Sequence, residues 1–268
     1  LSFNLDTSTI TQSFDGQLNT REGCSSISDD AGNLLFYTDG LTVWNQNHTA
    51  MTNGFGLNGD SSSTQSAIIV PKPSDPNIYY VFTVDNSLDG ANNGLSYSEI
   101  DMTLDGGLGA ITNKNIKLLN LCSEKITAVL KDCISEAIWV VTFASENGND
   151  AIYNTFHAFE VSALGVNITS KKSVFNTGVT DARGYLKLSP DGTKVACASV
   201  QDGLYIYDFE TDFNFTSWAM QFDQFHDWVM LEIRVFADEG FQLTAQQYRA
   251  ELILVDPYER FDIKTIYF

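Results

Sequence analysis

Four copies of a strand–turn–strand unit constrain what this chain can fold into. In each copy, a polar or glycine-bearing turn separates two runs rich in β-branched and aromatic residues, which favour strands. The copies occupy residues 24–40, 66–83, 127–142 and 184–199. Their turn centres are Gly32, Asn77, Glu136 and Gly192, which lie 45, 59 and 56 residues apart. A supersecondary unit that returns at long, roughly even intervals is typical of a modular array.

The segments that follow each unit extend it to about four strands. An aromatic-bearing strand follows every copy, and a fourth strand fits in the longer repeats. Four antiparallel strands in a repeat of about 40–50 residues are typical of one blade of a β-propeller. We therefore predict an all-β chain: a β-propeller of four-stranded antiparallel blades, in a ring that need not be complete. A β-sandwich or barrel could use similar hairpins, but it would not need a repeat of this length.

The prediction divides the chain unevenly. Residues 1–210 hold the blades, and residues 211–268 form an atypical last blade or a closing segment of the same domain. The tail lacks the Ser-Pro-Asp-Gly turn found at residues 189–192. Residues 245–254 could form a helix, although their second half reads equally well as a strand. Residues 263–268 could pair with the N-terminal strand or with a neighbouring molecule.

Charge and hydropathy exclude two classes of partner. Thirty-four acidic residues against fifteen basic ones give a net charge of −19. Such a surface repels phosphate backbones and anionic lipid, so we expect no nucleic-acid binding. No apolar run approaches the roughly 20 residues that span a bilayer, so we expect no membrane insertion. The chain opens on Leu1 without a basic leader, which suggests a mature or partial chain.

Several ordered motifs carry a resemblance to a known family. Examples are Ser63-Thr-Gln-Ser-Ala-Ile-Ile-Val-Pro-Lys-Pro73 and Gly184-Tyr-Leu-Lys-Leu-Ser-Pro-Asp-Gly-Thr-Lys194. Further stretches are residues 18–48, 51–54, 59–60, 76–85 and 97–109. Together they resemble a β-propeller found in large secreted proteins of the Bacteroidetes, many of which end in a gliding-motility-associated sorting domain. The resemblance covers roughly residues 1–210; no sorting domain is visible, and residues 211–268 do not follow the pattern.

The resemblance implies a location and a type of role. It implies export by the type IX secretion route and a place outside the cell or on its outer surface. It implies a binding or scaffold role, with no family-wide catalytic residues. We accordingly expect recognition or adhesion without catalysis and without a cofactor. The expected partners are a glycan, a cell-surface protein or a second copy of the chain.

Two small sets of residues are candidate sites because of the chemistry of their side chains, independently of the resemblance. Glu146, Asn149 and Asp150 supply hard oxygen ligands within one turn and are the candidate Ca²⁺ site, although turn formation alone also explains them. Cys122 and Cys133 bracket a short strand and could meet across a hairpin as a disulfide.

Two alternatives to recognition remain open. The first is a structural subunit of an extracellular filament, joined by a terminal strand exchanged between copies. The second is a polysaccharide-active glycosidase or lyase. Glu99 and Asp101 would be its paired carboxylates, since alternation along a strand places both on one face.

Overall fold

The described part of the chain is built from strands. The computed structural model describes residues 2–4, 9–11, 14–86, 93–132, 134–189, 192–210, 231–236, 249–255 and 261–267. Apart from one 3₁₀ turn at Asp105–Gly107, every regular element in these ranges is a β-strand. The all-β class predicted from the sequence is confirmed.

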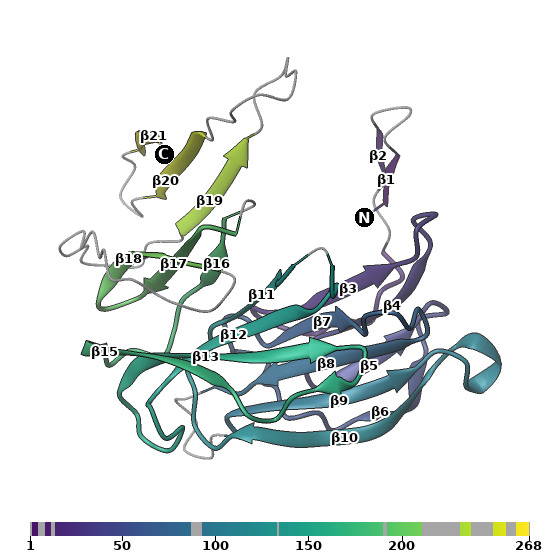
Figure 1. Ribbon diagram of the computed structural model, residues 1–268. Coiled ribbons are helices and arrows are strands. Elements are labelled where there is room, and N and C mark those ends of the chain that lie inside the picture. Colours follow the sequence, from purple (N-terminus) through teal and green to yellow (C-terminus); the bar gives the residue numbers. More distant parts are fainter. Residues whose placement is uncertain are drawn as a thin grey trace.

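An eight-stranded mixed sheet dominates the molecule (Figure 1). Its strands follow the order β3-β4-β5-β6-β10-β9-β8-β7. Their bounds are β3 Ser25–Ser28, β4 Leu34–Thr38, β5 Thr42–Asn45, β6 Ala50–Phe55, β7 Ala67–Pro71, β8 Ile78–Val84, β9 Leu95–Asp101 and β10 Ala110–Leu119. Two antiparallel meanders, β3–β6 and β7–β10, meet at a parallel pair in which Thr52 of β6 lies opposite Ala110 of β10.

The two ends of this sheet approach one another, so it forms a nearly closed barrel. Just before β3, the Arg21 amide donates to the Ser61 carbonyl at 2.9 Å, and the Gly23 amide donates to the Ser63 carbonyl at 3.2 Å. A Cβ atom on Gly23 would lie 2.2 Å from the Ser66 amide nitrogen, so this approach requires glycine. Backbone contact therefore joins the segments that lead into the two edge strands.

The predicted β-propeller is wrong. A propeller would keep β3–β6 and β7–β10 as separate blades, whereas the β6–β10 pair fuses them into one nearly closed mixed barrel. The repeat spacing correctly predicted that antiparallel meanders recur. Spacing carries no information on whether the last strands of two meanders hydrogen-bond to each other, and that pairing decides the architecture.

The remaining strands form smaller sheets. The five-stranded sheet contains β11 Ile126–Leu130, β12 Ile138–Ala144, β13 Tyr153–Ser162, β14 Gly165–Val166 and β15 Lys171–Val179, with both β14 and β15 paired to β13. The next sheet contains β16 Leu186–Leu188, β17 Lys194–Ser199 and β18 Gly203–Asp208. Two further sheets are β1 Ser2–Asn4 with β2 Thr9–Thr11, and β19 Leu231–Phe236 with β20 Arg249–Val255 and β21 Phe261–Tyr267.

The tail is described only in part. Residues 249–254 lie in strand β20, so the strand reading of that stretch is the correct one. Residues 211–230 lie outside the described residues. The division at residue 210 therefore stays a prediction.

All four predicted hairpins are present. Antiparallel pairing joins β3 to β4, β7 to β8, β11 to β12, and β16 to β17. The first turn contains Gly32 at φ +83°, and the third contains Glu136 at φ +54°. Polar and glycine residues at the turn centres therefore supply the left-handed backbone that these reversals use.

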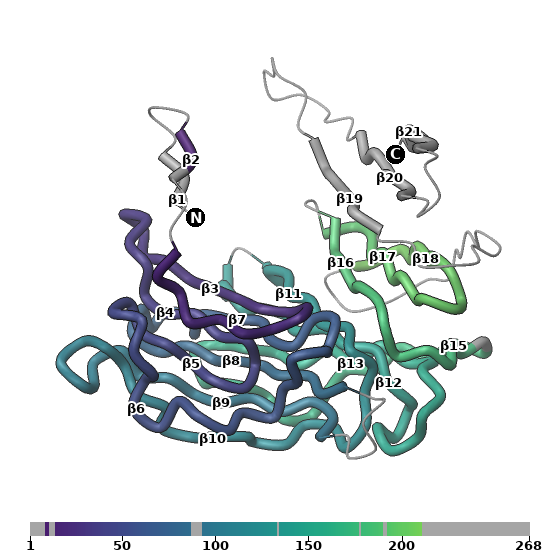
Figure 2. Tube along the Cα trace, turned by 180° about the vertical axis from the view of Figure 1, so that it is seen from behind, coloured from purple at the N-terminus to yellow at the C-terminus, as the bar shows by residue number. Residues whose placement is uncertain are grey.

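The core is layered, because two central strands bury both of their faces. Along β8, Tyr80 and Phe82 pack toward the five-stranded sheet, while Val81 between them packs inside the barrel. Alternation along a strand sends neighbouring side chains to opposite faces, so a continuous apolar run indicates a strand covered on both sides. The two views agree that the five-stranded sheet lies beside β7 and β8 (Figures 1 and 2).

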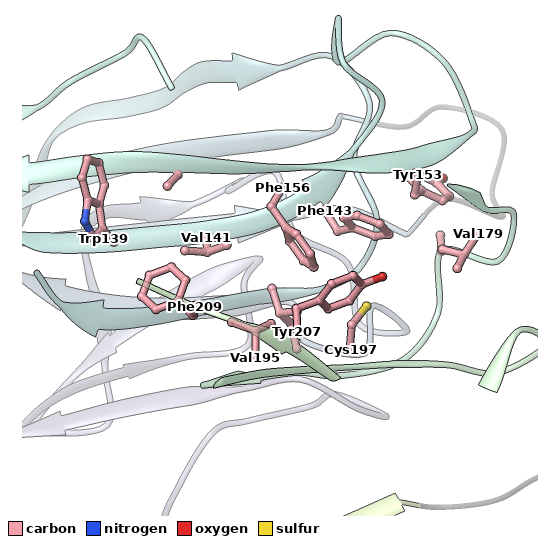
Figure 3. Packing of buried hydrophobic residues seen from close by; sticks show 13 residues of the cluster. Trp139, Val141, Phe143, Tyr153, Phe156, Val179, Val195, Cys197, Tyr207 and Phe209 are labelled. Carbon is pink, nitrogen blue, oxygen red and sulfur yellow. The ribbon is translucent and has the colours of Figure 1, made fainter. Parts of the chain in front are cut away.

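Strand β12 repeats this arrangement one layer further on. Val140 contributes to the cluster shared with β8, whereas Val141 and Phe143 face β16–β18. Figure 3 shows this last cluster, in which Phe156 and Tyr207 meet edge to face with ring centroids 5.0 Å apart. Successive sheets therefore stack through continuous apolar clusters.

Candidate functional site

An open hollow lies beside the loop that joins β12 to β13. Its volume is about 590 Å³. The lining residues come from this loop, from the start of β13 and from β15: Ser145, Glu146, Asn147, Asp150, Ala151, Ile152, Asn154 and Lys172. Ligand-binding pockets fall between about 300 and 1,000 Å³, so this hollow is large enough for a small ligand.

The loop is shaped by its own polar side chains. The Ser145 hydroxyl accepts hydrogen bonds from the backbone amides of Asn149 and Asp150, at 3.2 and 3.1 Å. The Asn147 amide oxygen also accepts from the Asn149 amide, at 2.8 Å, and Gly148 turns the chain at φ +67°. Short polar residues that bond to nearby backbone groups fold such turns locally.

A buried histidine supports the loop from below. His157 on β13 is fully buried and lies 2.8 Å through Nε2 from the Ser145 carbonyl oxygen and 3.0 Å through Nδ1 from the Ser170 hydroxyl. A carbonyl can only accept, so Nε2 carries the hydrogen. Burial lowers the pKa of His157, which favours the neutral ring. This histidine fixes the loop rather than facing the hollow.

Two of the three predicted calcium ligands line the hollow. Glu146 and Asp150 do so, whereas the Asn149 amide oxygen accepts a 2.8 Å hydrogen bond from Asn120. One Asp150 carboxylate oxygen accepts a hydrogen bond from the side-chain amide of Asn147 at 2.9 Å. Within the described ranges, no group of three or more His, Cys, Asp and Glu residues is placed to hold a metal ion. The calcium site stays a prediction.

A second polar cluster, which we call the hub, lies where three sheets meet. It consists of residues 63–66, 123–126 and 181–186, the segments that lead into β7, β11 and β16. The Gln65 amide donates to the Glu124 carbonyl at 3.2 Å, and the Glu124 amide donates to the Ala182 carbonyl at 3.1 Å. Backbone bonds therefore connect the three segments in series.

Two fully buried charged residues complete the hub. The Glu124 carboxylate accepts from the Thr64 amide at 3.0 Å and from its hydroxyl at 2.8 Å. The Lys125 ammonium donates to the carbonyls of Ala182 and Arg183 at 2.8 and 2.9 Å. Burial lowers the pKa of Lys125, because removal from water penalises the charged form. Both charges hold neighbouring chain segments together.

Sequence reasoning missed a chain of polar contacts near the N-terminus. His48 lies 3.2 Å through Nε2 from an Asp15 carboxylate oxygen and 3.0 Å through Nδ1 from the Tyr37 hydroxyl. The Gln17 amide also donates to that hydroxyl, at 3.0 Å. Tyr37 is buried, and its ring stacks on Trp44 at 5.5 Å. These contacts fasten residues 14–17 to the barrel, and their sequence separation leaves no local pattern to detect.

The paired carboxylates of the glycosidase alternative are occupied by neighbours. The Glu99 carboxylate accepts hydrogen bonds from the Thr112 hydroxyl at 2.7 Å and from the side-chain amide of Asn113 at 3.1 Å. Asp101 accepts from the Thr103 amide at 2.8 Å and from its hydroxyl at 2.6 Å. Through these hydrogen bonds, both carboxylates stabilise β9 and the turn that follows it.

Only one of the two cysteines of the candidate disulfide lies among the described residues. Cys122 is fully buried, and burial raises its pKa to about 12. Cys133 lies outside the described residues. The pairing therefore stays a prediction.

Two comparisons with known proteins find no match. No family model matches the chain, and no curated protein matches it. Among the described residues, no helix is long and apolar enough to cross a membrane.

Proposed function

We propose that this chain is a non-catalytic recognition module that works outside the cell. The observation that carries the proposal is the contrast between its buried and its exposed ionisable groups. Glu124, Lys125 and His157 are fully buried and hold backbone or hydroxyl groups of neighbouring segments. Glu146 and Asp150 instead lie exposed at an open hollow. Such a division suits a rigid scaffold that presents a binding loop.

The location rests on the motifs and on charge. The resemblance carried by the ordered motifs over residues 1–210 supports the proposed export to the outer surface. A net charge of −19 favours solubility and disfavours phosphate-rich partners. The partners we propose are accordingly a glycan or a cell-surface protein, and not nucleic acid.

Binding and turnover assays on the same preparation test this function. We expect the purified chain to retain specific glycans or surface proteins on an array while leaving the polysaccharides that carry them intact, as judged by reducing-end release. Release of reducing ends at a steady rate would contradict the proposal. In that case Glu99→Gln and Asp101→Asn would show whether the pair on β9 is responsible.

Exposed apolar side chains near the N-terminus favour a second function, self-association in an extracellular assembly. Phe14 is 86% exposed and Ile10 in β2 is 66% exposed. Such groups gain by burial against a second copy. We expect light scattering after size-exclusion chromatography to detect a concentration-dependent oligomer that Phe14→Ser weakens. Leu164→Ser, at a 99% exposed position, is the control; a concentration-independent monomer would contradict self-association.

A further inference from the structure

The hollow beside the β12–β13 loop presents donors and acceptors that the fold does not use. No hydrogen bond or ion pair within the described ranges engages the Glu146 carboxylate, and one of the two Asp150 oxygens is likewise open. Lys172 on β15 donates one bond, at 2.7 Å to the Glu146 carbonyl oxygen, out of the three that an ammonium group can make. Acceptors and a donor therefore border the same space.

The charges around the hollow disfavour ions of either sign. Two carboxylates repel an anion, and the overall charge of −19 adds to that repulsion. A cation meets the Lys172 ammonium in the lining and too few open oxygens, because Ca²⁺ takes six to eight oxygen ligands. The lining is consequently best matched to an uncharged ligand.

The hydrogen-bonding pattern and the shape select a class of uncharged ligand. A hydroxyl group both donates and accepts, so a ring of hydroxyls can donate to Glu146 and Asp150 and accept from Lys172. Ile152 lines the same hollow with its side chain 56% exposed, which gives the non-polar face of a ring a surface to rest on. A volume of about 590 Å³ accommodates a single ring with its bound water.

We propose that this hollow binds one neutral hexose residue of a glycan. In this assignment Glu146 and Asp150 accept hydrogen bonds from ring hydroxyls, Lys172 donates to another, and Ile152 supports the ring face. The proposal rests on the recognition function above and names its site and ligand class. His157 acts as a positioning residue through the Ser145 carbonyl, 2.8 Å from its Nε2.

Saturation-transfer NMR with methyl glycosides of glucose, galactose and mannose tests the site. We expect saturation transfer to at least one of them, and Glu146→Ala should bind at least about tenfold more weakly, because a hydrogen bond to a charged group is stronger than one between neutral groups. Ile152→Ala should also weaken binding. Neither side chain holds the fold, so both variants should remain folded by circular dichroism.

Matched variants and outcomes separate this proposal from the function on which it rests. Asp30→Ala and Leu164→Ala alter an exposed carboxylate and an exposed apolar side chain away from the hollow, and should bind like the wild type. Equal binding by Glu146→Ala, Ile152→Ala and the wild type would overturn the site while leaving recognition intact. Absence of transfer from all three glycosides, or a response to Ca²⁺ alone, would overturn the ligand class; turnover would overturn the recognition function.

Discussion

The hub should lose stability when one buried hydroxyl is removed. Thr64 is 9% exposed, and its hydroxyl donates to the buried Glu124 carboxylate at 2.8 Å while accepting from the Gly184 amide at 3.3 Å. Thr64→Val keeps the shape and removes both bonds. A bond to a charged group contributes about 1.5–3 kcal/mol, and the weaker one about 0.5–1 kcal/mol. We expect a loss of about 2–4 kcal/mol in the free energy of unfolding.

A matched variant isolates the effect of burial. The Thr52 hydroxyl donates to the Asp105 carboxylate at the same 2.8 Å, but at an exposed position. Water replaces that bond readily, so Thr52→Val should cost no more than about 1 kcal/mol. Urea unfolding followed by tryptophan fluorescence and circular dichroism measures both variants. Equal losses in the two variants would refute the claim that the hub is a buried junction holding three sheets together.

Two further predictions concern close packing and alkaline pH. Gly40 has φ +88°, and a Cβ atom there would lie 2.1 Å from the Ser66 hydroxyl oxygen. Gly40→Ala should therefore lower the midpoint of thermal unfolding by several degrees. An unchanged midpoint would contradict the close packing of Gly40 against Ser66. Burial, with nearby Glu99 second, raises the pKa of Tyr80 from 10.0 to about 12. The raised pKa of Tyr80 in the folded state contributes stability that is fully present below pH 10 and is lost as pH rises through about 12. The loss is at most about 3 kcal/mol, and Tyr80→Phe should remove this part of it in urea titrations at alkaline pH.

Local features of the sequence were enough to predict the hairpins. Turn centres such as Gly32 and Asn77 lie between runs of β-branched and aromatic residues, and both signals act within a few residues of the chain. Burial on both faces of β8 also follows from its continuous apolar run, residues 78–82. These features depend on backbone preference and on alternation, which any short segment carries by itself.

The candidate site was predictable only in part. The loop at residues 145–150 is marked by its polar residues, and Glu146 and Asp150 do line the hollow. Nothing in the sequence indicated that Lys172 and Ile152 would line the same hollow. Lys172 reaches the loop only because β15 pairs with β13, placing it opposite His157. Sequence spacing could not show that pairing.

The amino-acid sequence by itself determined an all-β chain of recurring antiparallel meanders with an acidic surface. Tertiary structure alone decided that β6 and β10 run side by side and join the first two meanders into one nearly closed barrel. It also decided that Glu124 and Lys125 lie in a buried junction between three sheets. The physical reason is range: turns and alternation act between neighbours, whereas strand-edge pairing and charge burial depend on segments that are tens of residues apart.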